Sequence, residues 1–125
     1  MILVDTSVWI NHLRSESLVL SGLLRSSRVV MHPLVLGELA CGNLNNRSQL
    51  LKLWGGLGSM PTVNHEETLF FIEKNALMGK GVGYIDVQLL ASVALDTGTK
   101  LWTQDKRLDV LATQLGYSWN EDHQS

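Results

Sequence analysis

Residues 2–7 read ILVDTS, three consecutive apolar residues followed at once by an aspartate, a threonine and a serine. An apolar run this short, without polar alternation, is typical of a strand that is buried on both faces of a parallel sheet. Trp9, Ile10 and Leu13 then recur at helical spacing. The segment therefore predicts a strand, a polar turn at Asp5 and a helix, which is the opening unit of an α/β fold.

The rest of the chain repeats this alternation of short β-like runs and longer helical patterns. Strands are expected at residues 2–4, 29–31, 62–63, 101–103 and 117–119. Helices are expected at residues 16–26, 33 to about 42, 47–57, 65–78, 85–97 and 106–115. This alternation predicts an α/β fold, with a central parallel sheet of four to five strands and helices on both faces. We expect one domain over residues 1–120 and a disordered tail over residues 121–125.

Length and composition limit the classes of protein that the chain can represent. Its 125 residues suit one domain, and 45% hydrophobic with 18% charged residues is ordinary for a globular protein. No apolar run approaches the roughly 18 residues that a membrane span needs, and the first residues lack the basic segment of a signal peptide. The lone Cys41 agrees with a reducing compartment, so a cytoplasmic protein with no membrane partner is expected. The net charge of −2 neither supports nor excludes a nucleic-acid partner.

Two carboxylates follow expected strands. Asp5 comes directly after the first strand, and Asp105 comes two residues after the fourth. Ligands of parallel α/β sheets bind at the carboxyl ends of the strands, so these two side chains are expected to converge. A structural alternative remains open for each, because Asp105 also suits the N-cap of the helix that it precedes and Asp5 also suits a turn.

Two further acids stand on apolar helical segments. Glu38 is the only charged residue between positions 31 and 41. Because unpaired burial of a carboxylate is costly, Glu38 either reaches solvent or is held by a cation in a cleft. Asp86 lies in the first turn of its helix, after a glycine-rich stretch at residues 79–83. Helix capping is the structural alternative for Asp86.

Together, the four carboxylates indicate a divalent cation. Two like charges about 6 Å apart repel by about 3 kcal/mol at an effective dielectric constant of about 20. A fold that gathers four acids without a cation is therefore penalised, whereas magnesium is held in proteins by a few carboxylates and retained water. No histidine or cysteine has the spacing of a zinc site, so Mg²⁺ or Mn²⁺ is the expected cofactor.

Four segments resemble the VapC-type toxins, which are the PIN-domain ribonucleases of bacterial toxin–antitoxin pairs. The segments are ILVDTS at 2–7, LGELACGNL at 36–44, GVGYIDVQLLAS at 81–92 and LWTQDKRL at 101–108. The resemblance covers the whole chain and implies a three-layer PIN fold with a catalytic and metal-binding set of Asp5, Glu38, Asp86 and Asp105. It also implies supporting polar roles for Ser7 and Thr103. Two departures from the family pattern, His32 and Leu108, are interpreted as packing or capping changes.

The resemblance implies metal-assisted hydrolysis of RNA, most often tRNA or rRNA, by a toxin that a cognate antitoxin neutralises. The metal would be held mainly by Asp5, Asp86 and Asp105. Glu38 would either bind a second metal or act as the general base, and the sequence leaves this open. The non-enzymatic alternative is a catalytically inactive PIN-like module that binds RNA or a partner. A haloacid-dehalogenase-type phosphatase is excluded because Ser7 stands where that class requires a second aspartate.

Other features concern assembly and RNA contact. One expected helix carries closely spaced apolar residues, namely Leu50, Leu51, Leu53, Trp54 and Leu57. They supply more apolar surface than one helix face buries in a small domain. With the resemblance, they predict a homodimer whose antitoxin covers another apolar groove. Lys80, Lys106 and Arg107 flank the expected cleft, where phosphate contact and a solvated surface role are both open.

Overall fold

A four-stranded parallel sheet forms the centre of the computed structural model, which describes residues 1–121. In spatial order the strands are β3 (Gly58–Ser59), β2 (Val29–Met31), β1 (Ile2–Val4) and β4 (Lys100–Trp102). Leu3 of β1 lies beside Val30 of β2 and Leu101 of β4. The ILV segment is therefore a central strand with a neighbour on each side, as its uninterrupted apolar sequence predicts.

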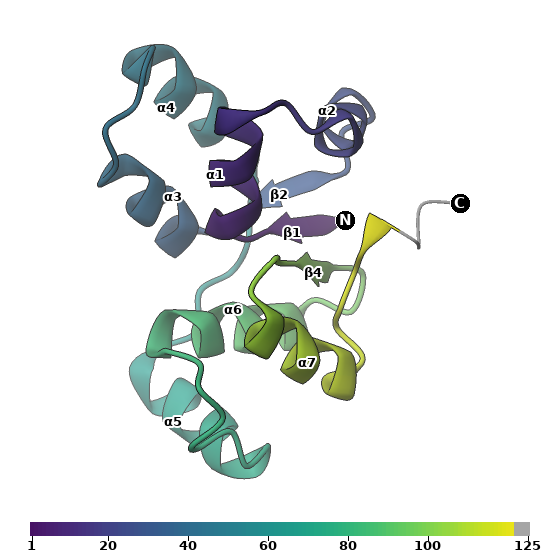
Figure 1. The fold of residues 1–125 in the computed structure, drawn as a ribbon. Helices are drawn as coiled ribbons and strands as arrows, with labels where there is room; N and C mark the ends of the chain where they lie inside the picture. The colour runs from purple at the N-terminus through teal and green to yellow at the C-terminus, as the bar shows by residue number, and fades with distance from the viewer. Residues whose placement is uncertain (122–125) are drawn as a thin grey trace.

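Helices cover both faces of this sheet, which confirms the α/β fold class. In the described part of the chain they are α1 (Thr6–Arg14), α2 (Leu18–Arg25), α3 (Pro33–Ala40), α4 (Arg47–Gly55), α5 (His65–Lys74), α6 (Tyr84–Leu95) and α7 (Lys106–Leu115). Figure 1 shows α1 to α4 grouped around β1 and β2, with α5 to α7 gathered beyond β4. Parallel crossovers are right-handed, so the reversal of direction between β3 and β4 places α5 and α6 on the face opposite to α1–α4.

The hydrophobic core joins the sheet to the helices. The three side chains of β1 are between 0 and 2% exposed. Trp9 of α1 meets Trp54 of α4 edge to face, with ring centroids 5.8 Å apart. Trp54 is only 1% exposed, so its expected place in a dimer or antitoxin interface was wrong. Of the five apolar residues at positions 50–57, Leu53 alone is mainly exposed, at 53%, and the others pack against or within the core.

The third strand lies earlier than expected. Residues 58–59 form β3, and the expected strand at 62–63 is absent from the sheet. The ladder continues only to Met60, whose N–H donates to the carbonyl of Met31 at 2.8 Å. Pro61 follows, and because proline has no N–H it cannot extend the ladder. Val63 is nevertheless buried, since its apolar side chain serves the core without belonging to a strand.

Two helices end before their expected limits. Helix α5 stops at Lys74, and Ala76 has a φ of 53°, a left-handed conformation that a helix cannot continue. Helix α6 stops at Leu95, and the side chain of Asp96 accepts hydrogen bonds from the Gly98 N–H and the Thr99 hydroxyl. Asp96 is therefore the C-cap residue of α6, and the helix ends two residues before the expected limit at residue 97.

The C-terminal segment joins the sheet less fully than expected. The strand expected at residues 117–119 is a single parallel bridge between Ser118 and Leu101. Of the tail expected at residues 121–125, all but Glu121 lies outside the described residues. None of the helices within residues 1–121 combines the length and the apolar character needed to cross a bilayer.

Candidate active site

Asp5 stands at the carboxyl end of the central strand and is held by two hydroxyl groups. Its side chain is only 6% exposed. Its Oδ2 atom accepts hydrogen bonds from Ser7 Oγ at 2.9 Å and from Thr103 Oγ1 at 2.7 Å. Asp5 is the N-cap residue of α1, yet its carboxylate makes no capping bond. Within residues 1–121 no donor reaches Oδ1, so this oxygen is available to a ligand.

Ser7 and Thr103 connect this aspartate to the segment that follows β4. Ser7 Oγ accepts a hydrogen bond from the Gln104 N–H at 3.0 Å, and Thr103 Oγ1 accepts one from the Asp105 N–H at 3.1 Å. Each hydroxyl has a single proton and gives it to Asp5, so the 3.3 Å approach of the two hydroxyl oxygens adds little. The network fixes the start of α1 against the turn that carries Asp105.

Glu38 projects from α3 toward the same edge of the sheet. Its side chain is exposed, and its Oε1 atom accepts a hydrogen bond from Thr6 Oγ1 at 2.8 Å. No role was expected for Thr6, although its position directly after Asp5 was a signal that it would lie beside the site. Thr6 holds one oxygen of Glu38 and leaves the second without a donor in the described residues.

Asp86 is the carboxyl group whose pKa is affected by the charges of the other three acids. It lies in the first turn of α6, and its Oδ2 atom accepts a 3.4 Å hydrogen bond from the Gly83 N–H. Burial raises the pKa of Asp86, and the charges of Asp5, Asp105 and Glu38 raise this pKa further, while the Gly83 hydrogen bond opposes the rise. Asp5, Asp105 and Glu38 are therefore close enough to Asp86 for their charges to act on its carboxyl group.

Asp105 has a structural role as well. It is the N-cap residue of α7, and its Oδ1 atom accepts hydrogen bonds from the N–H groups of Arg107 at 2.9 Å and Leu108 at 3.1 Å. The capping alternative that the sequence left open is thus realised. Oδ2 of Asp105 has no donor in the described residues, so the same carboxylate can cap a helix and face the acidic cluster.

The residues at this edge suit a hard divalent cation. They offer only carboxylate and hydroxyl oxygens, which Mg²⁺ and Mn²⁺ prefer over nitrogen or sulfur ligands. Asp5, Glu38 and Asp105 each keep one oxygen without a protein donor. Within residues 1–121, no three His, Cys, Asp or Glu side chains lie close enough together to hold a metal ion between them. The agreement with a divalent cation therefore rests on the chemical type of the oxygen donors.

His32 lies outside the acidic cluster and serves the fold. It is fully buried, and its Nδ1 atom accepts a hydrogen bond from the Leu34 N–H at 3.0 Å, which caps α3. Its Nε2 atom lies 3.0 Å from Ser92 Oγ. Burial lowers the pKa of His32 from 6.5 to about 4, so the ring is neutral at pH 7 and donates through Nε2. The interpretation of this departure as a capping and packing change agrees with these contacts.

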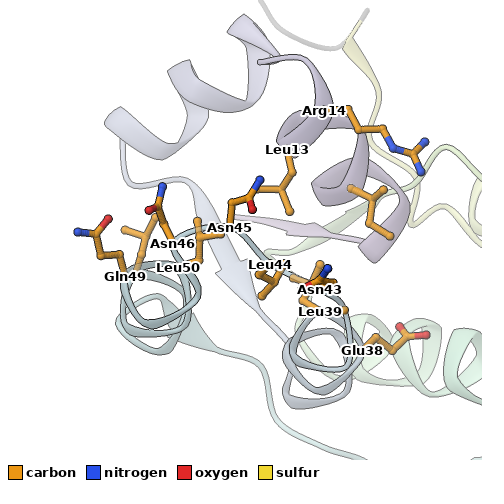
Figure 2. Close-up of a pocket in the computed structure, with 13 residues that line it drawn as sticks. Leu13, Arg14, Glu38, Leu39, Asn43, Leu44, Asn45, Asn46, Gln49 and Leu50 are labelled. Atoms are coloured by element: carbon orange, nitrogen blue, oxygen red, sulfur yellow. The ribbon is translucent and has the colours of Figure 1, made fainter.

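A groove of about 750 Å³ begins beside Glu38 and runs between α1, α3 and α4. Figure 2 shows Leu13 of α1, Leu44 of the intervening loop and Leu50 of α4 around this groove, with Glu38 at its edge on α3. The lining thus combines leucine side chains with amide side chains of the loop and α4, and it carries charges at Arg14 and Glu38.

Comparison with known proteins agrees with this geometry. A family model described as the PIN domain matches residues 2–114. Proteins named Ribonuclease VapC32, from two strains of Mycobacterium tuberculosis (CDC 1551 / Oshkosh and ATCC 25618 / H37Rv), are each 44% identical to this chain over 122 residues. The match covers 98% of this chain and 98% of each relative. A crystal structure of PAE2754 from Pyrobaculum aerophilum has a TM-score of 0.58 and 18% identity, and it covers 88% of this chain and 78% of that one.

Proposed function

Because the chain belongs to the PIN-domain family, as a ribonuclease of the VapC type, we propose that it hydrolyses RNA at its four carboxylates with Mg²⁺ or Mn²⁺. The observation that supports this site is the effect of Asp5, Asp105 and Glu38 on the pKa of Asp86. Helix capping uses one oxygen each of Asp86 and Asp105, but it does not require four like charges at one edge of the sheet. Hydrolysis of a phosphodiester with a divalent cation does require such a set. The proposed substrate is structured RNA such as tRNA or rRNA, and the proposed location is the cytoplasm.

The four carboxylates have different roles in the proposed hydrolysis. The chemistry that a divalent cation supplies when bound there is activation of water and neutralisation of the charge that develops on the reacting phosphate. Asp5 would hold the cation through Oδ1, because Ser7 and Thr103 already donate hydrogen bonds to its Oδ2. Asp86 and Asp105 complete the set. Glu38, oriented by Thr6, is exposed enough to take a proton from the attacking water or to hold a second cation.

We also propose that an antitoxin occupies the groove between α1, α3 and α4. The groove combines leucine side chains with amide groups, Arg14 and Glu38, which suits an antitoxin segment that carries apolar residues and places a cation beside Glu38. Such a segment would reach the catalytic acids while it fills the groove. Gel filtration of the toxin with its antitoxin, comparing Leu50→Asp with the wild type, tests this. Full complex formation by the variant would contradict it.

We also propose that the protein forms a homodimer through an exposed apolar surface on α5 and α6. Leu69 and Phe70 of α5 and Leu95 of α6 are 47, 67 and 61% exposed. Phe70 and Leu95 line a second hollow of about 520 Å³, and exposed apolar patches of this kind mark association surfaces. Phe70→Ser is expected to give a monomer in sedimentation analysis, whereas Leu18→Ser on α2 is expected to leave the dimer intact. A wild-type monomer at micromolar concentration would contradict the proposal.

Growth after induction tests the ribonuclease function directly. Expression of the wild type is expected to arrest growth and fragment cellular RNA, and Asp5→Asn is expected to do neither. Co-expression of the antitoxin should restore growth. An inactive PIN-like binding module predicts instead that wild type and Asp5→Asn behave alike, so equal arrest or equal growth would sink the proposed function.

A further inference from the structure

Three cationic side chains surround a hollow beside the carboxylate site. The hollow, of about 330 Å³, is lined by Lys80, Lys106 and Arg107 together with Val110, Leu111 and Gln114. Lys106 and Arg107 directly follow Asp105, and Lys80 stands in the loop that leads to the helix of Asp86. The cations therefore flank the acids on the side of α6 and α7.

The fold makes no use of these three charges. All three residues are exposed, and their side chains form no ion pair or hydrogen bond with any residue between 1 and 121. Lys106 and Arg107 are the first two residues of α7, where the positive end of the helix dipole disfavours cations. Charges that break a local rule without compensation are expected at functional sites.

Arg107 is also held in place by close contact with the glycine-rich loop. A Cβ atom added to Gly81 would lie 2.7 Å from both Cδ and Nη1 of Arg107. Gly81 has a φ of 82°, a conformation that favours glycine. The Arg107 side chain therefore lies directly against the backbone of the loop before α6, the same loop that carries Lys80.

We propose that Lys80, Lys106 and Arg107 bind backbone phosphates of the RNA next to the bond that is cut. This rests on the proposed ribonuclease function and adds positioning residues to it. Four carboxylates repel a polyanion, and a net charge of −2 gives no general attraction to compensate. A local cluster of cations supplies that attraction, with the guanidinium fork of Arg107 matching phosphate oxygens and the lysines acting as point charges.

The first test measures RNA binding without cleavage. The triple variant carries Lys80→Gln, Lys106→Gln and Arg107→Gln. It is compared with a control that loses the same charge through Arg25→Gln in α2, Arg28→Gln in the segment after α2 and Lys52→Gln in α4. Binding of labelled single-stranded RNA is followed in chelator from about 50 to 200 mM salt. The triple variant is expected to bind at least ~10-fold more weakly, with a salt slope shallower by about 2, since each lost contact removes about 0.7. The control should keep the wild-type slope.

The second test uses cleavage kinetics and separates this inference from the proposed function. The triple variant is expected to raise KM by about 10-fold with kcat unchanged, and its melting temperature should not fall. If the wild type binds RNA with the steeper slope but cleaves none, the ribonuclease function fails and the phosphate site stands. If the wild type cleaves and both triple variants share its KM and slope, the phosphate site is overturned. Loss of antitoxin binding with RNA affinity unchanged would also overturn it.

Discussion

Asp5 and His32 occupy equivalent places on neighbouring strands and are used in opposite ways. Each is the first residue after a central strand, and each is the N-cap residue of the following helix. Both are buried. His32 directs one nitrogen to the Leu34 N–H and the other to the Ser92 hydroxyl, whereas Asp5 makes no capping bond and turns its carboxylate toward Ser7 and Thr103.

The difference shows how the same backbone position separates stability from function. Both nitrogens of His32 are satisfied within the fold and its ring is neutral, so nothing further is required. Asp5 keeps one oxygen without a donor in the described residues and contributes to the repulsion that raises the pKa of Asp86. A buried group left incomplete in this way depends on a ligand to complete it.

The largest expected effect is on catalysis. Asp5→Asn, Asp86→Asn and Glu38→Gln should each reduce RNA cleavage by at least ~10²-fold, because each removes a cation ligand or the base for the attacking water. The measurement is single-turnover cleavage with Mn²⁺. Asn at position 5 still accepts hydrogen bonds from both hydroxyls, so the fold is retained while the charge is lost.

Ser92→Ala is the matched control on the His32 side. It leaves a buried ring nitrogen without a partner, so it should cost about 1–3 kcal/mol of stability. Cleavage by the folded protein should stay within about threefold of wild type. If Ser92→Ala were as inactive as Asp5→Asn, the separation between a stabilising role at position 32 and a catalytic role at position 5 would be contradicted.

Much of this arrangement could be predicted from local sequence. The ILV run defined the central strand, and Asp5 and Asp105 were expected at the carboxyl edge because each follows a strand. The capping role of Asp105 was also foreseen, since an N-cap depends on the residues immediately after it. Interactions set within a few residues of one another were accessible from the sequence.

Features that depend on long-range contact were not accessible. The Thr6–Glu38 hydrogen bond spans 32 residues and the His32–Ser92 contact spans 60. Neither pair has a sequence signature, because partners are chosen by how α1, α3 and α6 pack. Trp54 was misplaced for the same reason, since an apolar residue on a surface helix gives no sign that it will meet Trp9 in the core.

The next largest expected effect is that of His32 on the pH dependence of folding stability. Because burial lowers the pKa of His32 from 6.5 to about 4, the unfolded chain binds more protons than the folded protein in that interval. The contribution of His32 is therefore complete above pH 6.5 and is lost as the pH falls toward 4, with a loss of about 2 kcal/mol between about pH 7 and 4.5. Urea unfolding of His32→Asn should show a flatter profile of stability against pH over this range than the wild type does. Parallel profiles for wild type and His32→Asn would contradict a buried neutral ring.

The opposite sign is expected at Asp86. A carboxyl whose pKa is raised in the folded protein makes that protein less stable as the pH rises through the raised value, because the charged form is disfavoured. In chelator at pH 7, Asp86→Asn should therefore melt at a higher temperature than the wild type. The wild type should regain stability in millimolar Mn²⁺, by about 2.7 kcal/mol at a hundredfold excess over Kd, and the variant should lose most of that rise. Melts that ignore Mn²⁺ in both proteins would remove the case for a metal site.

The smallest effect is expected at Asp105, which combines the two uses that Asp5 and His32 keep apart. Its Oδ1 atom caps α7 through two backbone N–H groups, and Asn caps a helix about as well as Asp. Asp105→Asn should therefore change the melting temperature in chelator by no more than about 2 °C, since loss of repulsion and loss of charge at the helix N-terminus oppose each other. Cleavage should fall by about tenfold, less than for Asp5→Asn. Asp105→Ala should add a stability loss of about 0.5–2 kcal/mol because the cap itself disappears. If Asp105→Asn were instead as inactive as Asp5→Asn, while its melt stayed unchanged, Asp105 would act as a full metal ligand that caps α7 only incidentally.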